Sequence, residues 1–411
     1  MNKVFKNKHW LTASLLLLLS NLYYCQEIKS VQVFNPKTND ETPIIGFNDQ
    51  LILNFDDLNN SSEIFRYTLK HYDRNWQDDG LFFSEFANGT LSGLIEDRQY
   101  SFNTYQKYTH YKLAFPNDKI QPKISGNYEI VVYTDSPENP LFSKRFCLVE
   151  DGASIAMMSS RFSDARFPAL NQRIEVQAIS KNQNLLDNAN SISLSIIQNN
   201  NWDLGLYNMK PSSVLGNKLL FQQLSLAFPG NNEFYYFDNK NITVSYDMVA
   251  GAENKDGQNY TYLRPVWAFP NNYQYQPDVN GAFYFRRNDL GIERNPDNEG
   301  DYSWVYFVLD SEKSDKNIYV LGVFNDYTCN ETSQMQYDEV NKKYVAKIYL
   351  KQGFYNYLLA TKDSSGQINY GEINGNFWQT ENLYQGLLYY TPFGKNYDAL
   401  IGYGEIRKQV R

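Results

Sequence analysis

Apolar and polar residues alternate over short runs of this chain, and this period of two restricts its fold more than any other feature. In FRYTLK, the residues Phe65, Tyr67 and Leu69 fall on one face of an extended strand. The same alternation recurs at Ile174, Val176 and Ala178 in RIEVQAI and at Ile192, Leu194 and Ile196 in ISLSI. Turn-forming clusters separate such runs: SPENP at 136–140, NPDNEG at 295–300 and DSSGQ at 363–367. Half-buried strands joined by short turns predict antiparallel sheets packed as sandwiches.

Length and composition extend this prediction to several domains. The chain has 411 residues, more than one ordinary core accommodates, and its 34 Tyr and 26 Phe favour strands. The pattern breaks at an acidic glycine turn near residue 151 and in the polar NPDNEGD stretch near residue 298. We therefore expect an all-β protein of tandem immunoglobulin-like or early-set β-sandwich modules, at residues 26–152, 153–298 and 299–411.

The first residues predict export. Three lysines precede an apolar run that ends at Tyr24, in the order of a secretory signal peptide. The run is too short for a membrane anchor, and residues 1–25 are expected to be removed before Gln26. In the alternative, Cys25 becomes a lipidated N-terminus, although the bulky Tyr24 stands where a lipoprotein signal has a small residue.

Charge and cysteine content limit the partners. The formal net charge of −8 becomes −11 once the three signal-peptide lysines are removed, and the sequence has no basic block, so nucleic acid is a poor partner. Cys147 and Cys329 fall in different expected modules, and we interpret them as two small buried side chains rather than a disulfide.

Sequence signatures of catalysis are missing. The mature chain retains two histidines, and no HxH, HExxH or cysteine pair has the spacing of metal ligands. It has neither a GxSxG elbow nor a phosphate-binding glycine loop, and DNEGD at 297–301 is interpreted as an exposed loop because it lacks the alternating ligands of a calcium site. Two carboxylates without a local motif could still form a glycosidase, but no pair stands out. We expect no enzyme activity, cofactor, metal site or small-molecule substrate.

The segment TYQKYTHYKLAFPND, residues 104–118, concentrates aromatic rings and is the predicted interaction site. Tyr108 and Tyr111 are an odd number of residues apart, so they face opposite sides of a regular strand. Some rings therefore fill a core, and others lie outside it unless a second layer covers them. His110, like His71, is interpreted as a ring at a sheet surface or in a buried hydrogen bond. The predicted partner interface comprises Tyr105, Tyr108, His110, Tyr111 and Phe115.

The C-terminal part of the chain has strong strands separated by short turns, among them YSWVYFVLD and KYVAKIYLKQGFYNYLLA. A GxFN strand end comprises Gly322, Phe324 and Asn325, and a KxGxYxY hairpin comprises Lys351, Gly353, Tyr355 and Tyr357. This pattern resembles the early-set immunoglobulin-like domains, including the glycogen-binding kind.

Longer strings carry a second resemblance, which covers most of the mature chain and is weakest in the middle module. They are LKHYDRNWQ (69–77), EFANGT (85–90), 95–118, SGNYEIVVYTD (125–135) and RFCLVED (145–151), then YVLGVFND, LKQGFYNYLL and 375–402. These strings resemble the plug protein family of the type IX secretion system of Bacteroidota. Thr391 departs from the pattern, because a basic residue is expected after Tyr389 and Tyr390.

The resemblance implies a non-catalytic periplasmic protein. It would occlude the periplasmic opening of the outer-membrane translocon barrel when no cargo-carrying partner occupies that barrel. The barrel protein would be its partner, and any association with the membrane would run through that partner. The exported, acidic, strand-rich composition without an active-site constellation agrees with this role.

Two other functions remain open. A carbohydrate-binding protein could stack exposed rings on sugars, although a fold does not establish sugar binding. Trp304 and Trp378 are far apart in sequence, whereas a sugar-binding face commonly presents two tryptophans together. A surface adhesin or structural lipoprotein would need acylation of Cys25.

Overall fold

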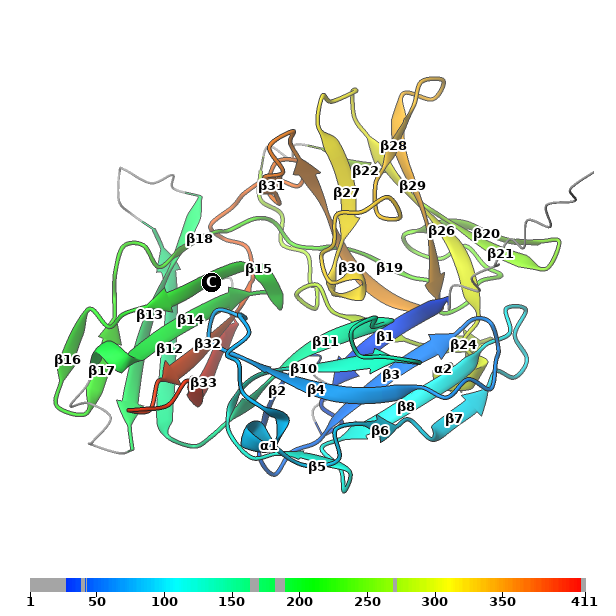
Figure 1. Cartoon of the computed structure of the whole chain (residues 1–411). Coiled ribbons are helices and arrows are strands. Elements are labelled where there is room, and N and C mark those ends of the chain that lie inside the picture. The colour runs from blue at the N-terminus through cyan, green and yellow to red at the C-terminus, as the bar shows by residue number, and fades with distance from the viewer. Residues whose placement is uncertain are drawn as a thin grey trace, which may run out of the picture.

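The computed structural model describes residues 27–37, 41, 43–162, 170–181, 189–268 and 272–407. Strands account for 53% and helices for 4% of it, which confirms the all-β prediction (Figure 1). The immunoglobulin-like topology stays a prediction. The expected signal peptide, with Cys25, lies outside the described residues.

The first unit, β1 to β11, is a sandwich of two sheets at the lower right of Figure 1. One sheet has the order β1 (Ile28–Phe34), β3 (Leu51–Asp57), β8 (Thr109–Phe115), β7 (Asp97–Tyr100). The other has the order β2 (Ile44–Gly46), β11 (Phe142–Val149), β10 (Gly126–Tyr133), β4 (Arg66–Tyr72), β6 (Gly93–Leu94). Short α1 (Phe83–Phe86) and the pair β5 (Ala87–Gly89) and β9 (Ile120–Pro122) complete it.

Alternation of side chains explains how these two sheets meet. In β4, Tyr67 and Leu69 are buried while Arg66 and Lys70 are exposed, as the period of two predicts. Phe65 and Tyr67 pack with rings from the facing sheet into one aromatic core. Each such ring removes a large apolar surface from water, so this core holds the two sheets together.

The middle unit, at the left of Figure 1, also has two sheets. One has the order β12 (Ala153–Arg161), β13 (Asn171–Ser180), β17 (Lys218–Phe221), β16 (Ser213–Leu215), with β18 (Ala227–Pro229) also paired to β13. The other has the order β15 (Asn201–Met209), β14 (Ile192–Gln198), β32 (Leu383–Tyr390), β33 (Ala399–Arg407). In β13, Ile174, Val176 and Ala178 face the core between these sheets, as predicted.

Strand β14 differs from the half-buried strand that ISLSI predicts, because all of its residues are buried. Ile192, Leu194 and Ile196 enter the core of the middle unit. On the opposite face, Ser193 accepts a hydrogen bond from Arg74 of the first unit, over 3.0 Å. A neighbouring unit therefore covers the face that the sequence pattern assigns to solvent.

The third unit, β19 to β31, lies at the top of Figure 1. One sheet has the order β20 (Val249–Lys255), β21 (Gln258–Leu263), β26 (Tyr302–Asp310), β29 (Lys343–Lys351), β28 (Gln336–Asp338), with β22 (Val266–Trp267) on β26. In the other, β30 (Gly353–Lys362) pairs with β19 (Tyr235–Asp238), β23 (Phe283–Phe285), β27 (Asn317–Leu321) and β31 (Ile368–Asn369). The hairpin β24 (Arg287–Asp289) and β25 (Ile292–Arg294), α2 (Pro296–Glu299) and the 3-10 turn η2 (Val323–Asn325) complete this unit.

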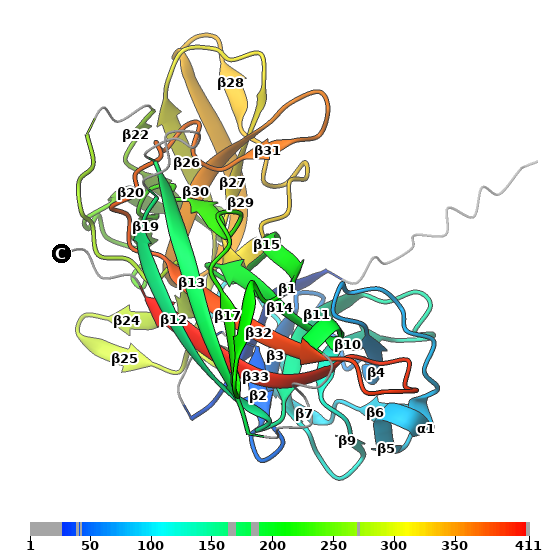
Figure 2. The ribbon, with the colours of Figure 1, turned by 90° about the vertical axis from the view of Figure 1, so that its left-hand side faces the viewer.

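Strand pairing groups the residues differently from the boundary expected at residue 298. The C-terminal strands β32 and β33 join β14 in the middle unit, as Figures 1 and 2 both show. Strands β19 to β23 precede residue 298 and pair with strands of the third unit. We propose that the third unit is an insertion in the middle one, because the pattern of a single strand does not record which distant strand completes its sheet.

Two segments connect the middle and third units, and they are hydrogen-bonded to each other. The backbone of Asn231 donates to the Asn376 side chain over 2.9 Å, and Phe377 N donates to the Asn231 carbonyl over 2.7 Å. A Cβ atom at Gly230 would lie 2.0 Å from the Phe377 carbonyl oxygen. Glycine is required there because the two backbones pass too closely for any side chain.

One buried and one half-buried carboxyl group accompany this crossing. Glu233, 5% exposed, accepts hydrogen bonds from the Tyr273 hydroxyl and, over 3.1 Å, from Glu381 N. Asp278 accepts from Phe234 N over 2.6 Å. Burial raises the pKa of Glu233 to about 7 and the pKa of Asp278 to about 6.

Cys147 is buried and Cys329 half-buried, and both are free thiols. Across the described ranges, the structure contains no helix with the length and apolarity to cross a membrane.

The raised pKa of Glu233 predicts a loss of stability with rising pH. Since the ordinary glutamate pKa is 4.5, the folded protein keeps a proton that the unfolded chain releases between about pH 4.5 and 7. This contribution is complete below pH 4.5 and is lost as pH rises through 7, and Asp278 acts with the same sign. Glu233→Gln should flatten the decline in unfolding free energy between pH 5 and 8 by up to about 3 kcal/mol. Urea unfolding followed by tryptophan fluorescence measures it.

A matched control is Glu331→Gln, which changes an exposed carboxylate of the third unit and should keep the wild-type pH profile. Identical pH profiles for Glu233→Gln and the wild type would contradict the prediction.

Candidate functional site at the junction of the units

Tyr111 and Phe115, two of the five predicted interface residues, lie in the core of the first unit. Both are 0% exposed. The Tyr111 ring stacks on Phe55 with centroids 5.2 Å apart, and its hydroxyl donates to the Glu63 carbonyl over 2.9 Å. A partner protein could reach neither ring without unfolding the unit.

Tyr108 and His110 lie between the first and third units. Tyr108 is 0% exposed, and its hydroxyl donates to the Gly300 carbonyl of the third unit over 2.7 Å. Its ring meets Tyr302 edge-on at 5.6 Å between centroids. The third unit is thus the second layer that covers the ring on the side opposite Tyr111.

A buried carboxylate lies at the centre of this contact. Asp56, at 0% exposure, binds His110 Nδ1 through one oxygen at 2.6 Å. Its other oxygen accepts from Lys351 Nζ over 2.7 Å and from the Tyr302 hydroxyl over 2.6 Å. Lys351 also lies 4.4 Å from the centroid of the Tyr108 ring. Two residues of the first unit and two of the third therefore share one hydrogen-bonded cluster around a single negative charge.

The electrostatics of the cluster favour an ionised Asp56. Burial by itself would raise the pKa of this carboxyl group. The Lys351 ammonium group and the hydrogen bond with His110 outweigh burial and hold the pKa of Asp56 below its ordinary value. Burial, followed by the charge of Asp56, raises the pKa of Tyr302, which therefore stays a neutral donor. The cluster is a charge-assisted tie between units.

Tyr105 differs from the other four predicted residues, all of which the structure describes, because its side chain is 62% exposed. Hydrogen bonds to the third unit nevertheless fix the backbone of its loop. The Asp301 carboxylate accepts from Tyr105 N over 2.7 Å and from Gln106 N over 3.1 Å. Phe102 N donates to the Asn298 carbonyl over 2.7 Å. The segment DNEGD is therefore not the exposed loop that we expected, because it forms part of α2 and buries Gly300 and Asp301 against the first unit.

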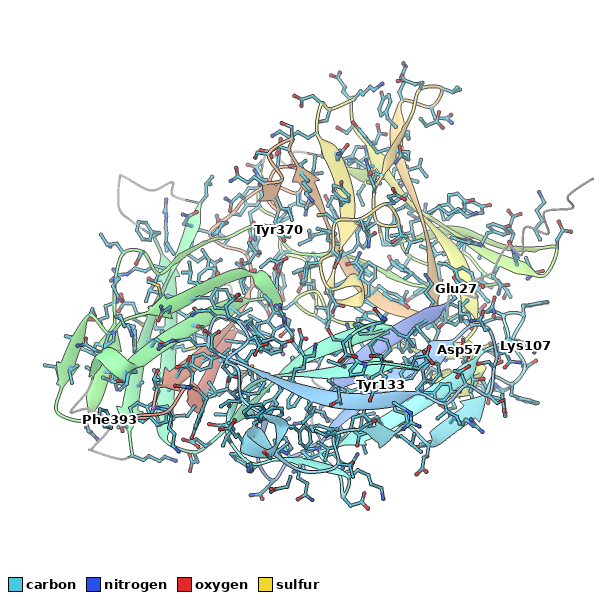
Figure 3. All side chains as sticks on the ribbon, viewed as in Figure 1. Glu27, Asp57, Lys107, Tyr133, Tyr370 and Phe393 are labelled. Atoms are coloured by element: carbon cyan, nitrogen blue, oxygen red, sulfur yellow. The ribbon has the colours of Figure 1, made fainter. Side chains whose placement is uncertain are left out.

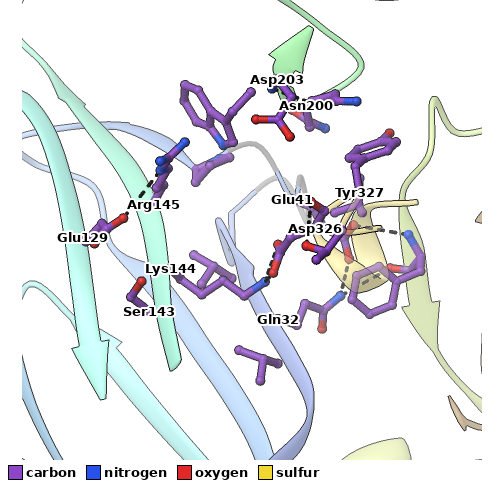
Figure 4. Close-up of a pocket in the computed structure, with 18 residues that line it drawn as sticks. Gln32, Glu41, Glu129, Ser143, Lys144, Arg145, Asn200, Asp203, Asp326 and Tyr327 are labelled. Carbon is purple, nitrogen blue, oxygen red and sulfur yellow. Dashed lines mark hydrogen bonds and ion pairs between the residues drawn. The ribbon is translucent and has the colours of Figure 1, made fainter. Parts of the chain in front are cut away.

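A cavity of about 360 Å³ marks the place where all three units meet (Figure 4). Strands β1, β10 and β11 line one side, residues 200–203 of the middle unit line another, and Phe283 with residues 323–328 of the third unit line the rest. Lys144 points toward Asp326 of the third unit and binds its two oxygens at 2.5 and 2.7 Å. Glu41, 6% exposed, accepts from Gln32 and, over 3.2 Å, from Phe283 N.

The first and middle units meet through an apolar patch with a polar centre. Ile44 and Cys147 pack there against Leu387, Tyr389 and Leu400. The Tyr389 hydroxyl donates to the Asn127 side chain over 2.7 Å. Thr391, which stands where a basic residue was expected, donates to Asp398 over 2.5 Å.

Sequence reasoning missed Asp56, Tyr302 and Lys351 as members of the site. The signals were present: FDD ends an apolar strand with two carboxylates, and Lys351 opens the KxGxYxY hairpin after an apolar run. Each signal is weak by itself, because only the folded structure brings Asp56 and Lys351, which are 295 residues apart in sequence, into contact.

Neither of the two histidines that the structure describes, His71 and His110, lies in a metal-binding arrangement. His71 is 4% exposed and binds the Asp79 carboxylate at 2.5 Å, in the interior of the first unit. Within the described part of the chain, no group of three or more His, Cys, Asp or Glu residues could hold a metal ion.

Comparison with known families bears on the first unit. The family model described as "Type 9 secretion system plug protein 1st domain" matches residues 28–150. The resemblance of this chain to the type IX secretion plug family is confirmed. The plug-domain match covers β1 to β11 and therefore contains Asp56 and all five predicted interface residues. It supports a non-catalytic role linked to type IX secretion, and a periplasmic location near the outer-membrane machinery.

A solved structure extends the similarity beyond the plug domain. It is described as the crystal structure of a hypothetical protein from Parabacteroides merdae ATCC 43184, at 2.30 Å resolution. The identity is 29%, the TM-score is 0.87, and the similarity covers 93% of this chain and 97% of that one. The arrangement of all three units is therefore shared. No curated protein matches the chain.

Removal of one partner from the Asp56 cluster should destabilise the protein strongly. Lys351→Met leaves the Asp56 carboxylate buried without its cation, which costs about 3–5 kcal/mol in unfolding free energy. Urea unfolding at pH 7 measures this loss.

The matched control is Lys343→Met in the same strand. The ion pair of Lys343 with Asp310 is partly solvated, with side chains 33% and 41% exposed, so its loss should change stability by less than about 1 kcal/mol. Equal losses of unfolding free energy in the two variants would show that the Asp56 cluster stabilises the protein no more than a partly solvated ion pair does.

Proposed function

We propose that this protein is a periplasmic plug, which occludes the periplasmic opening of the type IX outer-membrane translocon barrel while the barrel holds no cargo-carrying partner. The observation that carries the proposal is the plug-domain match over residues 28–150. The structural similarity over 93% of the chain supports it, because the plug-type first unit occurs in the same arrangement of three units in a second protein.

Resistance to deformation is the physical property that a plug needs. Each sheet is held by backbone hydrogen bonds and a close-packed core, so bending one breaks bonds and opens voids. Ties between the first unit and the other two extend this stiffness across their junctions: Asp56 with Lys351, Lys144 with Asp326, and Tyr389 with Asn127. A body tied at these junctions excludes solutes better than sandwiches joined by free linkers.

Reversible binding requires a moderate interface with exposed anchors. The loop from Phe102 to Lys107 provides such anchors, because Phe102 is 68% and Tyr105 62% exposed while Asp301 fixes the backbone. Tyr108 and His110 hold this loop against the third unit from within. In the proposal, Tyr105 contacts the barrel, and the four buried residues of the predicted interface position its loop.

A carbohydrate-binding role has less support from the surface. Trp304 has Lys347 Nζ 4.2 Å from its ring, and Trp378 has the Arg161 guanidinium at 5.3 Å. The two rings lie in different segments, Trp304 in β26 and Trp378 between β31 and β32. Trp304 contacts a cation of the third unit and Trp378 a cation of the middle unit, which does not favour a shared sugar-binding face.

Replacement of one exposed ring tests the proposed contact. Tyr105→Ala should reduce co-purification of the protein with the translocon barrel from outer membranes by at least fivefold, while its melting temperature stays within about 2 °C of the wild type, because exposed side chains contribute little to stability. Quantitative immunoblotting of the detergent-extracted complex measures this.

The control is Phe393→Ala, which removes a 96% exposed ring at the end of the molecule opposite Lys107 (Figure 3). It should leave co-purification unchanged. Deletion of the whole protein should make the outer membrane permeable to large hydrophilic antibiotics. A chain that never co-purifies with the barrel, and whose deletion causes no leak, would remove the proposal.

A further inference from the structure

A second and larger cleft, of about 750 Å³, opens between the first and third units. Residues 103–105 of the first unit form one wall. The third unit contributes residues 241–243, β20 and the turn of the hairpin β24–β25, which projects from its unit in Figure 2. The cleft therefore begins beside Tyr105, at the loop to which we assign the barrel contact.

One wall of the cleft is the edge of a sheet. Three consecutive residues of β20, Ala252 to Asn254, line it. Side chains alternate along a strand, so a strand that presented its face would contribute every second residue. Strand β20 ends its sheet, and apart from a bridge between its first residue, Val249, and Tyr246, no segment of the described ranges pairs with its outer side. The cleft thus follows a free strand edge, where N–H and carbonyl groups can pair with another chain.

The hairpin turn holds an apolar side chain at the rim in an unfavourable conformation. Leu290 lines the cleft, is 93% exposed and has a φ angle of 54°, next to Gly291 at 89°. Such a turn favours Asn or Gly at the position of Leu290, because a branched side chain is strained at positive φ. An exposed leucine in a strained backbone conformation does not stabilise the fold. Residues in strained conformations commonly occur at binding sites.

The polar groups of the cleft favour an uncharged occupant. Its charged residues already have partners within the chain: Lys107 with the Thr104 carbonyl, Glu253 with Tyr262, Arg287 with Asp289, and Asp301 with the backbone of Tyr105 and Gln106. Thr104, 7% exposed, lines the cleft, and its hydroxyl has no hydrogen-bond partner among the residues described. A neutral donor or acceptor from a ligand would complete this hydroxyl.

We propose that this cleft binds an extended, uncharged polypeptide segment as an added strand along β20, with an apolar side chain of that segment against Leu290. The inference rests on the proposed function, which makes the segment a periplasm-facing stretch of the translocon barrel. A strand edge matches a peptide main chain better than a sugar, because its donors and acceptors repeat at the spacing of another strand.

The test uses fluorescein-labelled peptides of 15 residues, tiled across the periplasm-facing segments of the barrel, and the purified mature chain. Fluorescence anisotropy should find at least one peptide that binds. Leu290→Asn should weaken its binding at least tenfold and yet leave the melting temperature equal or higher, since asparagine tolerates the positive φ angle. A merely structural leucine would not separate these two readouts.

The matched control is Val340→Asn, which changes an 88% exposed aliphatic residue in the turn between β28 and β29 and should leave peptide binding unchanged. The inference is overturned if no peptide binds, if Leu290→Asn binds as tightly as the wild type, or if maltoheptaose binds at the cleft instead. Co-purification of the full chain with the barrel is measured in parallel. If it persists without peptide binding, this inference fails and the proposed function stands, whereas its absence from the wild type removes the proposed function.

Discussion

The pairing of β14 with β32 is the constraint on which the arrangement of the chain depends. All seven residues of β14 are buried, so its backbone groups need partners within the protein. Strand β15 supplies them on one side, and β32, nearly two hundred residues further along, supplies them on the other. The strands of the third unit, β19 to β31, all lie between β14 and β32 in the sequence, so in the proposed insertion the chain leaves the middle unit and re-enters it at one place. The paired backbones at Gly230 and Phe377, with no space for a side chain, are the result.

Polar groups at the junctions of the first unit determine how the other two units are oriented on it. An apolar patch tolerates sliding, whereas a buried charge or amide is satisfied in one geometry. Asp56 meets Lys351 between the first and third units, and Asn127 meets Tyr389 between the first and middle units. Such contacts add modest net stability, because desolvation offsets much of their attraction. Their main effect is to penalise every other docking of the three sandwiches, which suits a protein that works through its shape.

The sequence was sufficient for local structure and insufficient for long-range pairing. Alternation predicts β4 and β13 with their inward residues, because burial of one face produces a period of two. Odd spacing separates Tyr108 from Tyr111, and the structure places them in two different apolar clusters. Alternation fails at β14, where a second unit covers the serine face, and the expectation of an exposed loop fails at DNEGD, where the end of a polar run, Gly300 and Asp301, is buried at a contact. Of the candidate site, the sequence located the aromatic loop but not Asp56, Tyr302 or Lys351, because a charged residue in a strand does not record its partner.

The return of the last two strands affects the order in which the protein can mature. A polypeptide emerges from a ribosome or an export channel with its N-terminus first, and the first and third units have all of their strands before residue 370. The middle sandwich lacks half of one sheet until residues 383–407 arrive. Until that moment β14 has an open edge and the core beside it is uncovered. An incomplete chain would therefore contain two folded sandwiches and a middle unit with an exposed strand edge and exposed core. Proteases could recognise this exposed surface before the chain reached any partner.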